Sequence, residues 1–360
     1  MTISPLLPAQ STSKLCIHSK LWGKTDGKEV RLYKLTNAKG IEVEITNYGG
    51  IVVSIKAPDR SGEIENIVLG FEKFEQYKKE NSPYMGAIIG RFANRIAGAE
   101  FVLDAVRYKL APNDNQNHSH GGEKGFDKVV WDASEISAAD SVGIALHYLS
   151  KDMEEGYPGN LSVTVNYMLN NDNELKIQYE AHTDKPTIVN LTHHSYFNLT
   201  VGKENILNHE LTICADYFTP TDPAWIPIGE VAPVAGTDFD FTQPHKVGER
   251  IKNLLNGYNM NFVLRKSSNN ELSKAAELYN SESGRFMQVY TTEPGLQLYT
   301  SDYFDGSITG SGNIVYEKNM GICLEAQHFP DSPNKTAFPT TVLRPGEAYT
   351  QLTIYKLSTK

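Results

Sequence analysis

Cysteine is scarce in this chain of 360 residues, and the three that occur, Cys16, Cys214 and Cys323, lie far apart. Without a Cys-x-x-Cys pair, the sequence gives no sign of a structural zinc site or of a redox-active dithiol. An odd number of scattered thiols is typical of a protein that stays in a reducing compartment. We therefore expect these cysteines to be buried or chemically idle side chains.

Clustered positive charge is also missing. The chain has 34 Lys and Arg against 43 Asp and Glu, for a formal net charge of -9. A nucleic-acid groove or a polybasic membrane patch needs concentrated basic side chains, so neither partner is expected. The N-terminus lacks the basic and apolar regions of a signal peptide, and no apolar run approaches the ~20 residues of a membrane span. These absences favour a cytoplasmic protein.

Long helical patterns are absent as well, and strand patterns dominate. Residues 161–169 alternate apolar and polar side chains with the period of two that is typical of a half-buried strand. Two short segments, 71–80 and 248–255, carry the best helical signals, and neither is long enough to build a helical layer. Further strands, separated by Gly- and Asn-rich turns, are predicted at 41–45, 175–179, 211–215, 286–291, 296–300 and 349–357.

Many strands with turns at short intervals predict an all-β sandwich or barrel. The sequence shows no Gly-rich phosphate loop after a strand, no repeat of fixed period and no linker rich in Pro, Gly and Ser. We therefore predict a single domain over residues 15–360. Residues 1–14, rich in Ser, Pro and Gln without periodicity, are predicted to be a loose tail.

Four short segments combine ionisable, amide and glycine residues within these strand-like surroundings. Polar side chains in such a context are costly to bury unless they are hydrogen-bonded or functional. The segments are 90–95 (GRFANR), 117–122 (NHSHGG), 190–199 (NLTHHSYFNL) and 324–331 (LEAQHFPD).

One interpretation of these segments is a metal site. His118 and His120 are two residues apart, so on a strand both would face one side and could hold an ion together with His194 and Glu325. A His-x-His pair is a weak metal signal, and no second carboxylate lies beside it. For His118 and for His193 we favour structural hydrogen bonds instead.

The other interpretation is a sugar site. A cyclic hemiacetal opens when a base removes the proton of the anomeric hydroxyl while an acid protonates the ring oxygen. A glutamate and a histidine suit these two proton transfers, and neither a metal nor a nucleotide is required. Arg, Asn, Gln and His side chains on rigid strands would bind the other hydroxyls. An aromatic residue could cover one face of the sugar, and the candidates are Trp131, Tyr196 and Phe197.

Over nearly its whole length the chain resembles the aldose 1-epimerase (galactose mutarotase) family. The resemblance includes all four polar segments and five further stretches, and in chain order the matching residues are 47–50, 90–96, 117–126, 190–199, 215–220 with 226–229, 236–241, 257–264, 294–300 and 324–334. It implies a large antiparallel β-supersandwich with few short helices. It also implies an isomerase that interconverts the α and β anomers of aldohexoses such as glucose and galactose, without a cofactor or a metal.

The resemblance also implies roles for individual residues. Glu325 matches the family's base and His194 its acid. Five further residues match positions that bind the sugar, and they are Asn94, Arg95, His120, Asn259 and Gln297.

Other polar residues of these segments are assigned structural roles. We expect Arg91 to pair with surface carboxylates, and Asn190 and Asn198 to bond turns or strands. Gly121 and Gly122 are expected to allow tight backbone geometry.

The chain departs from the family pattern at residues 259 and 260. Asn259 and Met260 stand where the family usually has Asp-His, so a charge-assisted bond to the sugar is lost. The affinity or the sugar preference is expected to shift while the proton transfers survive. A milder departure is His193, where Asn is common.

Two alternatives to the mutarotase remain open. One is a sugar-phosphate 1-epimerase, which needs a cluster of Arg and Lys, and the other is a catalytically inactive sugar-binding or regulatory protein. The expected partner is a small sugar, and the expected assembly is a monomer or weak dimer.

Overall fold

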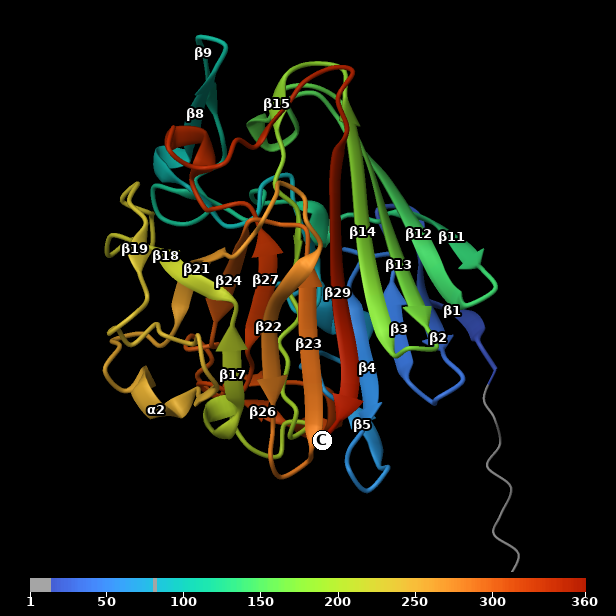
Figure 1. The fold of residues 1–360 in the computed structure, drawn as a ribbon. Helices are drawn as coiled ribbons and strands as arrows, with labels where there is room; N and C mark the ends of the chain where they lie inside the picture. The colour runs from blue at the N-terminus through green and yellow to red at the C-terminus, as the bar shows by residue number, and fades with distance from the viewer. Residues whose placement is uncertain (1–13, 80–82) are drawn as a thin grey trace, which may run out of the picture.

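The computed structural model describes residues 14–79 and 83–360, and strands dominate it (Figure 1), which confirms the all-β prediction. Within the described residues, α-helix is confined to α1 (Phe74–Tyr77) and α2 (Gly248–Ile251), each a single turn. Both lie inside the predicted helices but are shorter. Glu80, the last residue of the first predicted helix, lies outside the described residues. Residues 1–13 of the predicted tail lie outside them as well. Neither of these helices has the length and apolar character needed to cross a membrane.

The largest layer is a nine-stranded antiparallel sheet with the order β11-β12-β13-β14-β29-β23-β22-β17-β20. Strand β13 shows why the sequence forms it. Its apolar side chains, among them Val163 and Val165, are fully buried, whereas the alternating Ser162 and Thr164 are only partly covered. The strands are β11 (Asp132–Ser137), β12 (Ser141–Ser150), β13 (Leu161–Asn170), β14 (Glu174–Thr183), β17 (Glu210–Ile213), β20 (His245–Lys246), β22 (Ser273–Tyr279), β23 (Arg285–Thr291) and β29 (Tyr349–Thr359).

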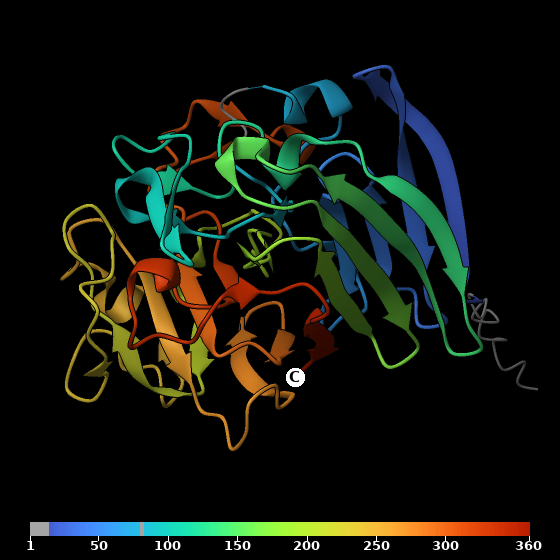
Figure 2. The same ribbon diagram turned by 90° about the horizontal axis from the view of Figure 1, so that it is seen from above.

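Two five-stranded antiparallel sheets pack against this layer. The first lies face to face with the β11–β14 side, as Figures 1 and 2 both show. The second lies beside β17, β22 and β23, and one hydrophobic cluster contains side chains from all three sheets. The first sheet contains β1 (Cys16–Thr25), β2 (Lys28–Thr36), β3 (Glu42–Thr46), β4 (Val52–Pro58) and β5 (Ile64–Asn66), and the second contains β19 (Ala232–Pro233), β18 (Ala215–Thr219), β21 (Asn259–Leu264), β24 (Gly295–Tyr299) and β27 (Cys323–Gln327).

The prediction of one continuous strand at 211–215 is wrong, because the chain passes from one sheet to another within this segment. Strand β17 ends at Ile213 in the nine-stranded sheet, and β18 begins at Ala215 in the second five-stranded sheet. Cys214 joins them, since its N–H donates to Ala275 O and its carbonyl accepts from Arg265 N. The other predicted strands lie on β3, β13, β14, β23, β24 and β29.

Short strand pairs bring the polar segments together. Strand β6 pairs with β16, β7 pairs with β10, and β16 also contacts β27. An isolated bridge between Phe92 and Asn190 adds a further link. The short pairs are β6 (Ile88–Ile89) with β16 (Thr192–His193), β7 (Arg95–Ile96) with β10 (His118–Ser119), β8 (Glu100–Leu103) with β9 (Val106–Lys109), β15 (Thr187–Ile188) with β28 (Val342–Leu343), and β25 (Ile308–Thr309) with β26 (Val315–Tyr316).

Candidate active site

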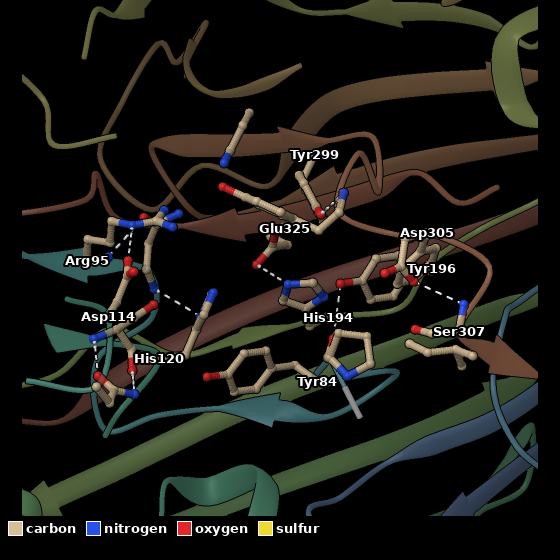
Figure 3. A pocket seen from close by; sticks show the side chains of 18 residues that line it. Tyr84, Arg95, Asp114, His120, His194, Tyr196, Tyr299, Asp305, Ser307 and Glu325 are labelled. Atoms are coloured by element: carbon tan, nitrogen blue, oxygen red, sulfur yellow. Dashed lines mark hydrogen bonds and ion pairs between the residues drawn. The ribbon is translucent and has the colours of Figure 1, made fainter. Parts of the chain in front are cut away.

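A cavity of about 440 Å³ opens where the polar segments meet (Figure 3). Its middle is occupied by His194 and Glu325, with Arg95, Asp114 and His120 at one end and Tyr196, Asp305 and Ser307 at the other. Six of the seven predicted site residues line it. They are Asn94, Arg95, His120, His194, Asn259 and Glu325.

Strand register explains how one sheet supplies several of these side chains. In the second five-stranded sheet, Asn261 stands opposite Gln297, and Gln297 stands opposite Glu325. Opposite residues of antiparallel strands share a face, and so do residues two apart, which places Asn259 on that face too. Polar side chains from β21, β24 and β27 therefore line the same side of the sheet.

His194 is held by the backbone on both sides. Its N–H donates to Ala87 O at 3.0 Å, and its carbonyl accepts from Gly86 N at 2.9 Å. His194 directly follows the last residue of β16, which pairs with β6. These two bonds fix the backbone of His194 against residues 86 and 87.

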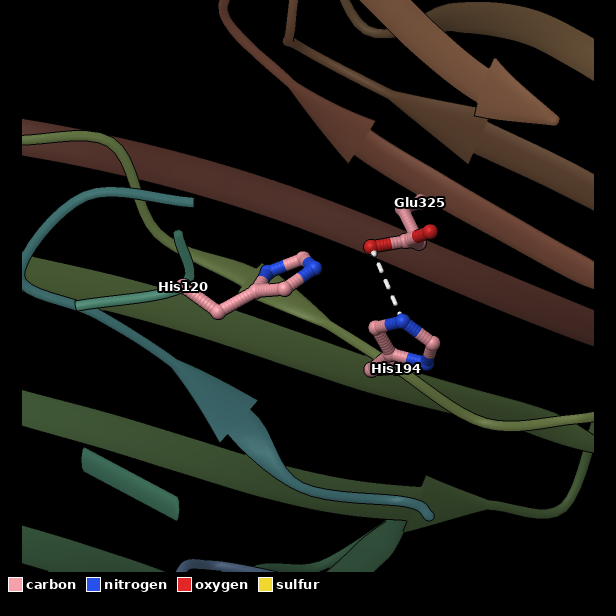
Figure 4. A group of neighbouring side chains, drawn as sticks. All are labelled: His120, His194 and Glu325. Atoms are coloured by element: carbon pink, nitrogen blue, oxygen red, sulfur yellow. Dashed lines mark ion pairs between the residues drawn. The ribbon is translucent and has the colours of Figure 1, made fainter. Parts of the chain in front are cut away.

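The Glu325 and His194 side chains form a close and buried pair (Figure 4). His194 Nε2 lies 3.6 Å from Glu325 Oε2, and the side chains are 5% and 2% exposed. Desolvation raises the pKa of Glu325 to about 8, and the charge of Arg95 opposes that rise. Desolvation lowers the pKa of His194 to about 4. The pair therefore holds one proton across a wide pH range around neutrality, which suits a reaction that needs one acid and one base.

His120 is held in one tautomer by the backbone. Its Nδ1 accepts a hydrogen bond from Asn94 N at 3.3 Å, so the neutral ring carries its proton on Nε2. Burial lowers its pKa well below the usual value, which keeps the ring neutral. Its position depends on the following glycine, because a Cβ at Gly121 would lie 1.8 Å from Gly90 O. His120 can thus donate an Nε2–H bond into the cavity.

This tautomer bears on the metal interpretation. Ligand atoms of His120, His194 and Glu325 lie within 4.8 Å of one another. A metal on Nε2 of His120 would need a lone pair there, and Nδ1 would then carry a proton facing the Asn94 N–H. The donor set fits a metal poorly for that reason. His118, predicted on the same face as His120, bonds Ala111 O and the Tyr157 hydroxyl outside this group.

The first polar segment is anchored by two acidic residues. Arg95 Nε donates to Asp114 Oδ2 at 2.7 Å, which leaves the two terminal nitrogens of the guanidinium for a ligand. Asp331 holds the backbone of the same segment, because its N–H donates to Arg95 O at 2.8 Å and its Oδ1 accepts from Ala97 N at 3.0 Å. Asn94 takes a positive φ of 63° at this point. The acidic residues thus set the position of both Asn94 and Arg95.

Gln297 is the predicted site residue that does not line the cavity. Its Nε2 donates to Asn259 Oδ1 at 2.7 Å, so Gln297 lies behind Asn259. The carbonyl of Asn259 is therefore engaged, and its amide group remains to donate to a ligand. Asn259 is 8% exposed.

The expectation for Arg91 is wrong. Its guanidinium is buried and donates to the carbonyls of Pro158, Gly159, Ser150 and Lys151 rather than pairing with surface carboxylates. Five donors in a planar fork can bond several carbonyls at once, which explains how this charge is tolerated inside the protein.

The other structural assignments are confirmed. His193 Nε2 bonds the Ser195 hydroxyl, and the amides of Asn190 and Asn198 bond backbone carbonyls. Of the aromatic candidates for a sugar face, Trp131 and Phe197 are fully buried in the core.

Sequence reasoning missed much of the cavity wall, including Asp114, Tyr84 and Tyr299. An Asn-Asp pair such as residues 113 and 114 is typical of a turn, so the sequence around Asp114 carries no signal that it lines a site. Tyr84 and Tyr299 carry no motif that separates them from core tyrosines. In the structure, the Tyr84 ring packs 4.7 Å from His120 and 6.0 Å from His194, between ring centroids.

Comparisons with known proteins agree on one family. A family model described as aldose 1-epimerase matches residues 31–356. The chain is 44% identical to galactose mutarotase from Homo sapiens, with 88% of this chain and 91% of that protein covered. It is 35% identical to aldose 1-epimerase from Escherichia coli strain K12, covering 92% and 96%. Among solved structures, galactose 1-epimerase from Lactobacillus acidophilus NCFM aligns with a TM-score of 0.84 at 30% identity, over 96% of this chain and 99% of that one.

Proposed function

The chain belongs to the aldose 1-epimerase family, and we propose that it interconverts the α and β anomers of free aldohexoses with Glu325 as general base and His194 as general acid. Galactose is a proposed substrate because two of the relatives are named for it, and glucose is proposed as a second aldohexose. The observation that carries the residue assignment is the buried contact of 3.6 Å between these two side chains in the middle of a polar cavity.

The proposed reaction moves two protons. Glu325 takes the proton of the anomeric hydroxyl while His194 protonates the ring oxygen, and the bond between C1 and the ring oxygen breaks. The open aldehyde turns about its C1–C2 bond and closes again on either face. The reverse transfers return both protons, so the enzyme ends in its starting state without a cofactor.

The protonation state of the pair fits this cycle. One proton shared by Glu325 and His194 can sit on the carboxyl or on the imidazole, and both arrangements contain the same number of protons. Sugar hydroxyls that donate to the carboxylate favour the arrangement with a charged imidazole. Nε2–H of His120 and the guanidinium of Arg95 are placed to bind oxygen atoms of the sugar.

Charge in the cavity favours a free sugar over a sugar phosphate. Among the described residues that line the cavity, Arg95 is the only lysine or arginine, and its Nε already donates to Asp114. The buried Arg91 is occupied by backbone carbonyls. A catalytically inactive sugar-binding protein has no need for a matched acid and base, which favours the enzyme over that alternative.

Polarimetry of freshly dissolved α-D-glucose and α-D-galactose tests the proposal. Glu325→Gln and His194→Ala should each lower kcat about 100-fold or more, as expected for a lost proton-transfer group. The exposed pair formed by His245 and Glu249 provides matched controls, His245→Ala and Glu249→Gln, which should keep wild-type rates. Wild-type rates in both site variants would refute the assignment.

A chelator separates the metal alternative from the acid–base reaction. Exhaustive EDTA treatment is expected to leave the rate near its starting value. Complete loss of activity, restored by added metal, would support a metal held by His120, His194 and Glu325 instead.

A further inference from the structure

A second cavity, of about 350 Å³, lies around β28, and most of its walls come from residues 340–350. Among the described residues, none that lines it also lines the cavity of the candidate active site. His328, three residues after Glu325, forms part of its wall, together with Thr341 and Tyr349. The proposed reaction uses none of these three wall residues.

A buried glutamate orients the His328 ring. His328 Nδ1 lies 2.5 Å from Glu293 Oε2, and the side chains of His328 and Glu293 are 21% and 3% exposed. Burial disfavours a charge on His328, but the charge and the hydrogen bond of Glu293 exceed that effect and raise the pKa of His328. Nε2 of His328 has no hydrogen-bond partner among the described residues, so this nitrogen is left for a ligand in the cavity.

The surrounding wall is held in place by hydrogen bonds. The His328 N–H donates to Asn190 Oδ1 at 2.9 Å, and the His328 carbonyl accepts from Asn190 Nδ2 at 3.2 Å. The Tyr349 hydroxyl donates to Gln351 Oε1 at 2.8 Å and accepts from Leu191 N at 3.2 Å, which fixes its ring. The imidazole and the phenol ring are therefore positioned before any ligand binds.

Hydroxyl groups match the hydrogen-bonding chemistry of this wall. When His328 is neutral, Nδ1 donates to Glu293 and Nε2 is an acceptor, and when His328 is charged, Nε2 becomes a donor. A hydroxyl can bond to Nε2 in both states, whereas a carboxylate or an ammonium group matches only one of them. The Thr341 hydroxyl is buried without a partner among the described residues, and a ligand hydroxyl could supply that partner.

Charge and shape narrow the class of ligand further. Glu293 neutralises the charge of His328, Glu347 lines the cavity, and no lysine or arginine does so among the described residues. An anion is therefore disfavoured. The Tyr349 ring and the side chains of Val189 and Leu343 provide apolar surface for the C–H face of a ligand. A neutral molecule with several hydroxyls and an apolar face is a sugar.

We propose that this cavity is a second, noncatalytic binding site for a neutral sugar, in which Nε2 of His328 bonds a sugar hydroxyl and the Tyr349 ring forms one wall. Because neither Glu325 nor His194 lines this cavity, the site does not depend on the proposed reaction.

NMR of ¹⁵N-histidine-labelled full-length protein tests the site, with D-galactose as the probe. His328 is assigned by the ring signals lost in His328→Ala. At constant pH and ionic strength, we expect these signals to move with galactose along a curve that saturates. Inorganic phosphate at the same concentrations should leave them in place, because the wall offers no uncompensated positive charge.

Cavity-filling variants test where the sugar binds. Ala348 is an exposed residue of the wall, so Ala348→Trp places a large ring in the cavity and leaves the Glu293–His328 pair intact. It should weaken the affinity for galactose measured at His328 about 10-fold or more, while the His194 signals still respond. Thr340→Trp fills the cavity from another exposed position and should act in the same way. Ala139→Trp makes a matched change in the turn between β11 and β12 and should have no effect.

The outcomes separate this site from the proposed function. His328 signals that stay in place, or that shift without saturating, would overturn the site, as would an unchanged response in both cavity-filling variants. A response to phosphate and not to galactose would contradict a neutral ligand, and loss of kcat in folded Ala348→Trp would contradict a noncatalytic site. Wild-type rates in Glu325→Gln and His194→Ala would instead refute the proposed function and leave the His328 response as expected.

Discussion

The pH dependence of kcat/KM follows from the environment of the proton-transfer pair. Burial raises the pKa of Glu325 to about 8 and lowers that of His194 to about 4, so the pair holds one proton between these values. Below about pH 4 a second proton binds and the base is lost, and above about pH 8 the last proton leaves and the acid is lost. We expect a plateau between them, and a rate about 10-fold lower at pH 9 and about 100-fold lower at pH 10.

Polarimetry over pH 4 to 10 measures this profile, with the spontaneous reaction at each pH subtracted. Circular dichroism at each pH shows that the protein stays folded. Residual activity in Glu325→Gln should lose the alkaline limb, because an amide does not ionise. An alkaline limb centred near 6.5, the usual value for histidine, would refute the reasoning, and so would a profile that stays flat to pH 10.

Three substitutions extend the test to other parts of the site. Asn259→Asp should lower KM for galactose about fivefold with little change in kcat, because a carboxylate can keep the bond from Gln297 and accept a sugar hydroxyl in a charge-assisted bond. Asp114→Asn should raise KM about 5- to 10-fold with kcat nearly unchanged, because Arg95 loses its charged partner. Arg91→Met should lower the free energy of unfolding in urea by about 3 kcal/mol or more, because several buried carbonyls lose their donor.

Each of these substitutions has a contrasting outcome. Unchanged kinetics with both sugars in Asn259→Asp would show that this side chain does not touch substrate. A fall in kcat alone in Asp114→Asn would contradict a role in binding. For Arg91→Met, the control is Arg107→Met, which removes an exposed ion pair with Glu100 and should cost less than about 1 kcal/mol.

Much of the fold could be predicted because the strands alternate so regularly. Strand β13 was predicted to within one residue, since its apolar residues, such as Val163 and Val165, alternate with polar ones that are only partly buried, and this pattern leaves one orientation for the strand. The break at Cys214 could not be predicted, because a change of sheet depends on which strands lie nearby and not on local pattern.

The candidate site, like the fold, could be predicted only in part from the sequence. Residue chemistry alone left a metal site and a sugar site open, and only the ordered family resemblance favoured the sugar. Asp114 could not be assigned, because its contact with Arg95 joins residues 19 positions apart across a loop. We expected Arg91 at the surface because a charged residue is usually exposed, whereas its fork of donors satisfies carbonyls at both ends of the connection between β12 and β13.

The place of β29 in the nine-stranded sheet has a consequence for synthesis of the protein. This strand of 11 residues pairs with β14 on one side and β23 on the other, so it joins the two halves of the sheet. It also follows every strand that it joins in chain order, so it is synthesised after all of them. Until then β11–β14 form one group of this sheet and β23, β22, β17 and β20 form another, and the open edges between the two groups are exposed to pairing with other chains. We therefore expect nascent chains that lack β29 to require chaperone binding, and we expect the chaperone to be released once β29 has been translated.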